Sequence, residues 1–213
     1  MFRLFKICFT TIMLIGFFSI NRSYSQDKMG WGFNIGAAYD SFRGNDYSDL
    51  LEFKIGYLAG IGNRMNIAPS LNLNIDLNYE LKAYKLETSL QLGSQEIISE
   101  YLNKYHFINL PVVFDVPFDG EKLWFFELGG YVNFLLGESL EIETVIPRFK
   151  KLDYGMLLGI GKVFEFNNNM DLIVGLRYEL GLVNTAMNEG SAPAGIDVRT
   201  SSIKLMFTWV FAK

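Results

Sequence analysis

Polar and apolar residues alternate with a period of two over most of this chain. The clearest run covers 71–82, where Leu, Ile and Tyr fill the odd positions and Asn, Asp, Glu and Lys fill the even ones. This is the strand period, because successive side chains of a strand point to opposite faces of the sheet. A tilted strand needs about 9–11 residues to cross the hydrocarbon layer of a membrane. The run therefore predicts a transmembrane β-strand.

Seven further segments show related alternation. The predicted strands cover 30–40, 51–62, 67–83, 100–115, 122–137, 151–165, 170–183 and 201–212. The connections alternate between long (41–50, 84–99, 138–150, 184–200) and short (63–66, 116–121, 166–169). Outer-membrane barrels show this asymmetry, with long loops outside and short turns on the periplasmic side. We therefore predict an all-β protein, an eight-stranded antiparallel up-and-down transmembrane β-barrel.

The first 25 residues follow another pattern. Arg3 and Lys6 precede an apolar run over 7–20, and small residues, Ser23 and Ser25, stand at the −3 and −1 positions of a cleavage site. This is the layout of a secretory signal peptide. The alternative, an uncleaved anchor, needs a run of about 20 apolar residues. We predict a signal peptide at 1–25, cleaved after Ser25, and an outer-membrane barrel domain at 26–213.

Composition and charge narrow the function classes. Half of the residues are hydrophobic and 15% are aromatic, yet no second run is long enough for a membrane-spanning helix. Without the signal, 19 − 3 = 16 Lys and Arg face 23 Asp and Glu, a net charge of −7. Nucleic acid is excluded as a partner, because binding it requires a basic face. The single cysteine, Cys8, lies in the signal, so disulfides cannot stabilise the exported chain.

Aromatic residues sort to the two ends of the predicted barrel. Trp31, Trp124 and Trp209 fall at the periplasmic end. The residues toward the outer end are Tyr39, Phe53, Tyr84, Tyr101 and Tyr154. Amphipathic rings favour the headgroup level of a membrane, so we predict two aromatic girdles, a periplasmic one made by the three tryptophans and an outer one made by the second group.

The polar faces of the strands would point into the lumen. They carry Asn34, Lys54, Asn72, Asn74, Asp76, Asn78, Glu80, Asn109, Glu127, Asn133, Arg177, Glu179 and Lys204. An eight-stranded barrel is only wide enough for side chains to fill it, and buried charges need partners. We expect Arg177 and Lys204 to pair with Asp76, Glu80, Glu127 or Glu179 in a structural network, with inward glycines relieving the crowding. The alternative is a proton or ion pathway.

No catalytic or cofactor constellation stands out. The segment GIGKV at 159–163 lacks the spacing and the Ser or Thr of a phosphate-binding loop. His106 is the only histidine, and Ile108 stands where a serine would share its face. The nearest acids are Glu100 and Asp115. No cluster has metal-ligand spacing. We predict no catalytic residue, no cofactor and no metal site.

Two segments carry a family resemblance. The C-terminal KLMFTWVF at 204–211 resembles the signal read by the barrel-assembly machinery, with Met206 where glycine is usual. The segment YHFINLPVVF at 105–114 resembles a strand of the Bacteroidetes PorT-like outer-membrane β-barrel family, with Asn109 where an acid is commoner. The resemblance implies outer-membrane lipid as surroundings and the assembly machinery as a partner during insertion. Some members of that family are associated with secretion or gliding machinery.

Three functional hypotheses remain. The leading one is a non-enzymatic barrel with a role in envelope structure or as accessory to a secretion or surface complex. The loops 84–99 and 184–200 are then the natural contact sites for a protein partner, since loops carry function on rigid scaffolds. The second is a lipid-modifying enzyme of the outer membrane, supported only by His106 and the outer acids. The third is a soluble lipocalin-like carrier, whose apolar face would point inward.

Overall fold

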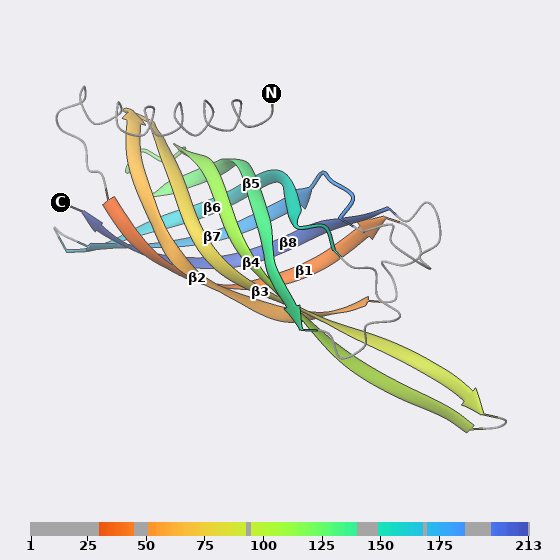
Figure 1. The fold of residues 1–213 in the computed structure, drawn as a ribbon. Coiled ribbons are helices and arrows are strands. Elements are labelled where there is room, and N and C mark those ends of the chain that lie inside the picture. Colours follow the sequence, from red (N-terminus) through yellow and green to blue (C-terminus); the bar gives the residue numbers. More distant parts are fainter. Residues whose placement is uncertain are drawn as a thin grey trace, which may run out of the picture.

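The chain forms a closed barrel of eight antiparallel strands, each paired with its neighbours in sequence and β1 paired with β8 (Figure 1). The computed structural model describes residues 30–44, 51–92, 95–139, 149–167, 170–185 and 197–212. The strands are β1 (Gly30–Gly44), β2 (Leu51–Ala68), β3 (Leu71–Leu92), β4 (Gln95–Pro117), β5 (Trp124–Ser139), β6 (Leu152–Asn167), β7 (Met170–Gly181) and β8 (Val198–Ala212). The predicted architecture is confirmed, whereas the predicted signal peptide at 1–25 lies outside the described residues.

The barrel closes through a long ladder between its first and last strands. Pairing of β1 with β8 runs from Gly30 opposite Ala212 to Gly44 opposite Val198. Closure leaves no unpaired strand edge around the wall, so every strand finds backbone partners on both sides. In the described part of the chain no helix is long and apolar enough to span a membrane.

The outer wall of the barrel is apolar. Along β3, Leu77 is 47% exposed whereas the neighbouring Asn78 is 1% exposed. Large exposed side chains occur on every strand, for example Phe33, Ile61, Leu128, Leu158, Leu176 and Leu205. A soluble protein would bury these groups, whereas a transmembrane barrel presents them to lipid. The lipocalin-like alternative is therefore wrong, because its apolar faces would line the interior.

The predicted long loop at 84–99 is also wrong. The β3–β4 ladder continues to Leu92 opposite Gln95, which leaves only two residues between the strands. Pairing of β2 with β3 stops at Leu86, and pairing of β4 with β5 stops at Lys104. The end of the hairpin therefore leaves the wall and projects beyond the barrel (Figure 1). Two strands can continue past a barrel rim because each supplies the backbone partners of the other.

The opposite end of the barrel carries short connections. Residues Pro69 and Ser70 alone join β2 to β3. Between β4 and β5, the Asp119 carboxylate accepts hydrogen bonds from the backbone N–H groups of Leu123 (3.2 Å) and Trp124 (3.1 Å). These bonds replace ladder partners that the turn residues lack. Since short turns face the periplasm in outer-membrane barrels, this end is the periplasmic one.

Candidate functional site: the polar lumen

A bidentate ion pair crosses the lumen between β7 and β5. Arg177 Nε and Nη2 donate to the two carboxylate oxygens of Glu127 at 2.8 and 2.9 Å. Arg177 Nη1 donates to Asp76 Oδ2 of β3 at 2.8 Å. The guanidinium can reach Glu127 because Gly159, which lies between them in β6, has no side chain. A planar guanidinium suits such paired carboxylates because its N–H groups form a fixed fork.

A second cluster lies closer to the outer end. Lys204 Nζ of β8 contacts Glu80 Oε2 at 2.9 Å and Glu179 Oε2 at 2.8 Å. Lys82 Nζ lies 2.9 Å from Asp40 Oδ1 and 3.6 Å from Glu80 Oε1. All five side chains are buried. They therefore form one alternating cluster of acids and bases, which offsets the cost of removing each charge from water.

The six charged residues that were expected to pair in the lumen all lie inside it: Asp76, Glu80, Glu127, Arg177, Glu179 and Lys204. The expectation that Lys54 belongs with them is wrong, because Lys54 is exposed. A bulge between Lys54 and Tyr57 adds one residue to β2. One extra residue reverses which side chains of a strand point inward.

Several lumen charges were missed by the sequence reasoning. Asp40 and Lys82 complete the outer cluster, and the even position of Lys82 in the run 71–82 was a usable signal. At the periplasmic end, Arg64 Nη2 lies 3.2 Å from Asp115 Oδ2, and its guanidinium lies 5.0 Å from the centroid of the Phe125 ring. Only the register between strands reveals these partners.

A belt of amides connects one row of the wall. The cross-strand row consists of Asn34, Gly60, Asn78, Asn109, Asn133 and Asp153, on β1 to β6 in order. The amides donate in one direction, Asn34 to Asn78 (3.1 Å), Asn78 to Asn109 (3.4 Å), Asn109 to Asn133 (2.7 Å) and Asn133 to Asp153 Oδ2 (3.3 Å). Gly60 lets the first bond pass over β2.

The amide belt ends at the buried carboxylate of Asp153. Asp153 is 3% exposed and also accepts a hydrogen bond from Thr200 Oγ1 at 2.8 Å, on the same Oδ2 atom. Its Oδ1 atom has no hydrogen-bond partner among the described residues. Every other buried carboxylate in the described ranges pairs with a Lys or Arg. Among the described residues, no Lys or Arg therefore forms an ion pair with Asp153.

Aromatic rings fill the outer end of the lumen. Phe42 of β1 packs on Tyr84 of β3, with ring centroids 4.6 Å apart, and stacks on Phe149 at 5.1 Å. Phe149 also meets the edge of Tyr105 from β4 at 4.8 Å. The expectation that Tyr84 belongs to an outer interfacial girdle is therefore wrong. Its even position puts it on the inward face of β3, where it is 3% exposed.

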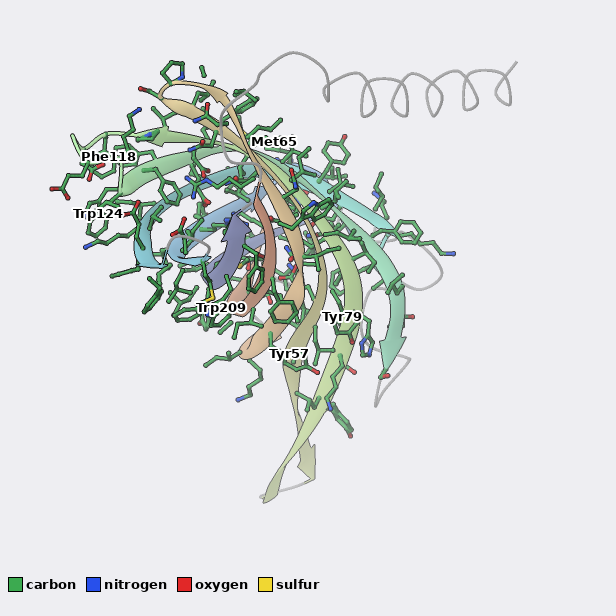
Figure 2. The ribbon with its side chains drawn as sticks, turned by 90° about the vertical axis from the view of Figure 1, so that its left-hand side faces the viewer. Tyr57, Met65, Tyr79, Phe118, Trp124 and Trp209 are labelled. Carbon is green, nitrogen blue, oxygen red and sulfur yellow. The ribbon has the colours of Figure 1, made fainter. Side chains whose placement is uncertain are left out.

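The three tryptophans lie at the end with the short connections. Trp31 is the second residue of β1, Trp124 begins β5, and Trp209 lies three residues before the end of β8. Trp31 and Trp124 are exposed on the outer wall, and Trp209 is half-buried. Figure 2 shows Trp124 beside Phe118 at this end, with Tyr57 and Tyr79 nearer to the hairpin. The Lys162 ammonium lies 4.9 Å from the centroid of a Trp124 ring.

His106 lies on the outer wall rather than in the lumen. It is half-buried, and its Nδ1 is hydrogen-bonded to the hydroxyl of Tyr79. Asp115 points into the lumen nine residues further along the same strand, a separation of roughly 30 Å at the rise of a strand. Asp115 therefore cannot act with His106. Among the residues the structure describes, no three His, Cys, Asp or Glu side chains gather as a metal site.

Comparison of the sequence with models of known protein families shows the family of this chain. Residues 22–186, most of the chain, match the model of the outer membrane protein beta-barrel domain. This chain belongs to that family. The outer-membrane barrel family and the apolar wall together place the protein in the outer membrane. A comparison with curated proteins gave no match.

Solved outer-membrane proteins resemble this family member only distantly. Neisserial surface protein A is 16% identical, with a TM-score of 0.46, 88% of this chain covered and 100% of that chain. OprG from Pseudomonas aeruginosa is 11% identical, with a TM-score of 0.46. The match covers 87% of this chain and 94% of that chain. Ail of Yersinia pestis, solved with the heparin analogue sucrose octasulfate, is 11% identical, with a TM-score of 0.43. The match covers 87% of this chain and 100% of that chain. Likeness at this level carries no argument about function.

The geometry of this outer-membrane barrel limits what the lumen can do. Ion pairs bridge opposite walls at two levels, and the amide belt and the aromatic rings occupy further levels. The side chains fill the narrow interior of eight strands. The site is therefore arranged to hold the barrel in one shape.

Proposed function

We propose that this protein is a non-enzymatic, non-conducting outer-membrane barrel that acts at the cell surface as an accessory of a secretion or surface complex. The PorT-like resemblance of 105–114 motivates the second half of the proposal. The alternative role, in envelope structure alone, needs no surface partner. The assembly machinery and outer-membrane lipid are the partners expected during insertion.

The buried ion pair of Arg177 with Glu127 and Asp76 is the observation that carries the proposal. It spans the lumen from β7 to β5 and β3, so an ion crossing the barrel would have to break it. A buried pair is costly to separate, because separation leaves an uncompensated charge in the low-dielectric interior. A barrel closed in this way can act only through its surfaces.

The β3–β4 hairpin is the surface best placed to meet a partner. Among the described residues, 87–100 pair only with each other, because pairing with β2 ends at Leu86 and pairing with β5 ends at Lys104. The hairpin thus offers two backbone edges outside the wall, and a free strand edge can accept another strand by β-augmentation. The connection 186–196, within the predicted contact loop 184–200, lies outside the described residues.

Conductance across planar lipid bilayers tests the closed lumen. We expect the purified full chain to give no single-channel current, while an open porin in the same bilayer gives clear steps. The bare bilayer is the negative control, and the open porin is the positive control. Stable current steps from the folded protein would overturn the non-conducting half of the proposal and favour the ion-pathway alternative.

Shortening the hairpin tests the accessory role. One variant replaces residues 87–100 with a two-residue turn, and a second variant replaces them with a Gly/Ser segment of equal length, which keeps the chain length but removes the strand pair. Both should remain folded barrels in the outer membrane. We expect complexes extracted after cross-linking of native envelopes to carry the full-length protein and to lose both variants. A cross-linked complex that persists in the shortened variant would contradict a hairpin-bound partner.

A further inference from the structure

One cross-strand row on the outer wall, near the hairpin end, carries two lysines. Lys54 of β2 stands opposite Ala83 of β3, and Ala83 stands opposite Lys104 of β4. Both lysines are exposed. Neighbouring strands lie about 4.8 Å apart, so the two lysine backbones are about 10 Å apart with only the small Ala83 side chain between them. Two long and flexible side chains at this spacing can converge on one group above Ala83.

A backbone irregularity places Lys54 in this row. Without the bulge between Lys54 and Tyr57, the alternation of β2 would turn Lys54 into the lumen. Bulges re-aim side chains in this way. On the wall, the lysine stem can lie along apolar surface while its ammonium reaches the membrane interface. The bulge therefore brings a second ammonium group to the level of Lys104.

His106 lies in the adjacent row of the wall. This row consists of Tyr57, Leu81, His106 and Gly137, on β2 to β5 in order. The Tyr79 hydroxyl is hydrogen-bonded to His106 Nδ1, and Figure 2 shows Tyr57 and Tyr79 on the outside of the barrel toward the hairpin. Because a tyrosine hydroxyl is a ready donor, Nδ1 accepts and the ring proton stays on Nε2. His106 thus offers an N–H group next to the lysine row.

The height of these residues matches the outer headgroup level of a membrane. On β4 the alternate residues before His106 are all apolar, namely Val116, Phe114, Val112, Leu110 and Ile108. From Val116 to His106 the strand rises about 33 Å, which is about 25 Å of height at a tilt of about 40°. The apolar band of an outer-membrane barrel is also about 25 Å tall. His106 and Lys104 therefore meet the polar headgroups.

We propose that Lys104, His106 and Lys54 bind the phosphate group of a lipid in the outer leaflet. A phosphate is anionic and has several acceptor oxygens, which suit two ammonium groups and an imidazole N–H. Lys54 also takes part in an interaction within the chain, so Lys104 and His106 are the main donors. The inference rests on the outward direction of the hairpin end and does not depend on the proposed accessory role.

Nearby acids do not cancel this positive charge. Glu52, two residues from Lys54, stands opposite Lys85 in the ladder, so these two positions together add no net charge. Glu138 of β5 stands opposite Tyr105, which is buried in the lumen. Residues directly opposite each other share one face of the sheet, so Glu138 belongs to the inner side of the rim. The wall at this level therefore favours an anionic headgroup.

Lipid binding to the purified full chain in detergent micelles tests the inference. The probes are lipid A with both phosphate groups, lipid A with both phosphates removed, and sodium phosphate, and native mass spectrometry measures the bound lipid. The phosphorylated lipid should bind at least about tenfold more tightly than the phosphate-free lipid, because charge-assisted hydrogen bonds are lost without the phosphate. Free phosphate at equal concentration should not displace the lipid, because it lacks the apolar contact of acyl chains with the wall.

Variants of the two main donors locate the site. Lys104→Gln should weaken binding of the phosphorylated lipid about fivefold, the worth of one cation near a charged lipid surface, whereas Lys104→Arg should preserve binding. His106→Phe removes the Nε2 donor and should weaken binding about two- to tenfold. The matched control is Lys162→Gln. Lys162 lies beside Trp124 at the opposite interface, so this variant should leave binding unchanged.

Several results would overturn the inference. Equal binding of the phosphorylated and phosphate-free lipids would do so, and displacement by free phosphate would mark a site for free anions instead. Equal weakening by Lys104→Gln and Lys162→Gln would show general attraction of the lipid to any lysine of the wall. If Lys104→Gln does not migrate as a folded barrel on an unboiled gel, His106→Phe and the comparison of the two lipids decide. Loss or persistence of the hairpin-dependent complex bears only on the proposed function.

Discussion

At the scale of single residues, glycines allow lumen side chains to reach across a strand. A Cβ atom at position 159 would lie 2.5 Å from Glu127 Oε2, and one at position 60 would lie 2.4 Å from Asn78 Oδ1. Gly159 separates Arg177 from Glu127, and Gly60 separates Asn34 from Asn78. These glycines are required for close approach, since any side chain there would occupy the path of the bond.

Replacement of Gly159 by Ala should therefore weaken the barrel. The added methyl group displaces the Glu127 carboxylate and strains its bidentate pair with Arg177, at a cost of about 1–3 kcal/mol in the free energy of unfolding. Urea unfolding from lipid vesicles measures it. Gly137→Ala is the matched control, because a Cβ there meets no atom within 4 Å. Equal stability of the two variants would show that Glu127 can shift without loss.

Removal of the Arg177 guanidinium should have a larger effect. Arg177→Met leaves the carboxylates of Glu127 and Asp76 buried in the lumen without a cationic partner. We expect a loss of about 3–5 kcal/mol in the free energy of unfolding. Adding Glu127→Gln and Asp76→Asn removes the two unpaired charges and should recover part of that loss.

The control for this series is Arg199→Met. Arg199 and Asp197 form an exposed pair, each 45% exposed, so its loss should change the free energy of unfolding by less than about 1 kcal/mol. Equal losses for Arg177→Met and Arg199→Met would mean that the lumen pair is screened as if it were at the surface.

At the scale of elements, β3 and β4 differ from the other strands because their ladder continues past the rim. Both strands exceed 20 residues, whereas β7 has 12. Bilayer thickness limits the other strands, since about 9–11 residues suffice for a span. The surplus length of the hairpin serves no membrane requirement and continues the β3–β4 ladder beyond the wall.

An epitope tag tests the direction in which the hairpin projects. A tag inserted between residues 93 and 94 should be accessible to antibody on intact cells, because the long-hairpin end faces outward. A tag inserted in the β4–β5 turn at Gly120 should be detected only after the outer membrane is permeabilised. The reverse labelling pattern would mean that the long-hairpin end faces the periplasm.

At the scale of the whole molecule, the barrel places its polar groups inside and its apolar groups outside. Interior ion pairs, an amide belt and a closed ladder all join strands that are distant in sequence. Such a structure unfolds only when many contacts between neighbouring strands break together, so it should resist detergent at room temperature.

Gel mobility should report this resistance. The unboiled protein from isolated outer membranes should migrate as a compact folded species, and boiling should shift it to the position of the unfolded chain. The protein should be found in the outer-membrane fraction. Identical mobility before and after boiling would mean that the lumen network does not hold the barrel closed in detergent.

Alternation along the chain determined the strand number, the barrel class and the inward face of each strand. Arg177, Lys204 and their four acidic partners could be predicted because parity alone puts them in the lumen, and a narrow lumen forces charges to pair. The same parity rule failed at Lys54, since a bulge is a backbone irregularity that a pattern of side chains does not show.

Only the tertiary structure decided which residues meet. The amide belt joins Asn34 to Asp153 because five strand registers align them, and registers depend on how the sheet closes. The extended hairpin follows from pairing beyond the rim, and the ring contacts of Tyr84 with Phe42 and Phe149 follow from packing inside the barrel. The sequence by itself sets faces, because they depend on neighbours along one strand. Partners across the lumen depend on the shear and closure of all eight strands.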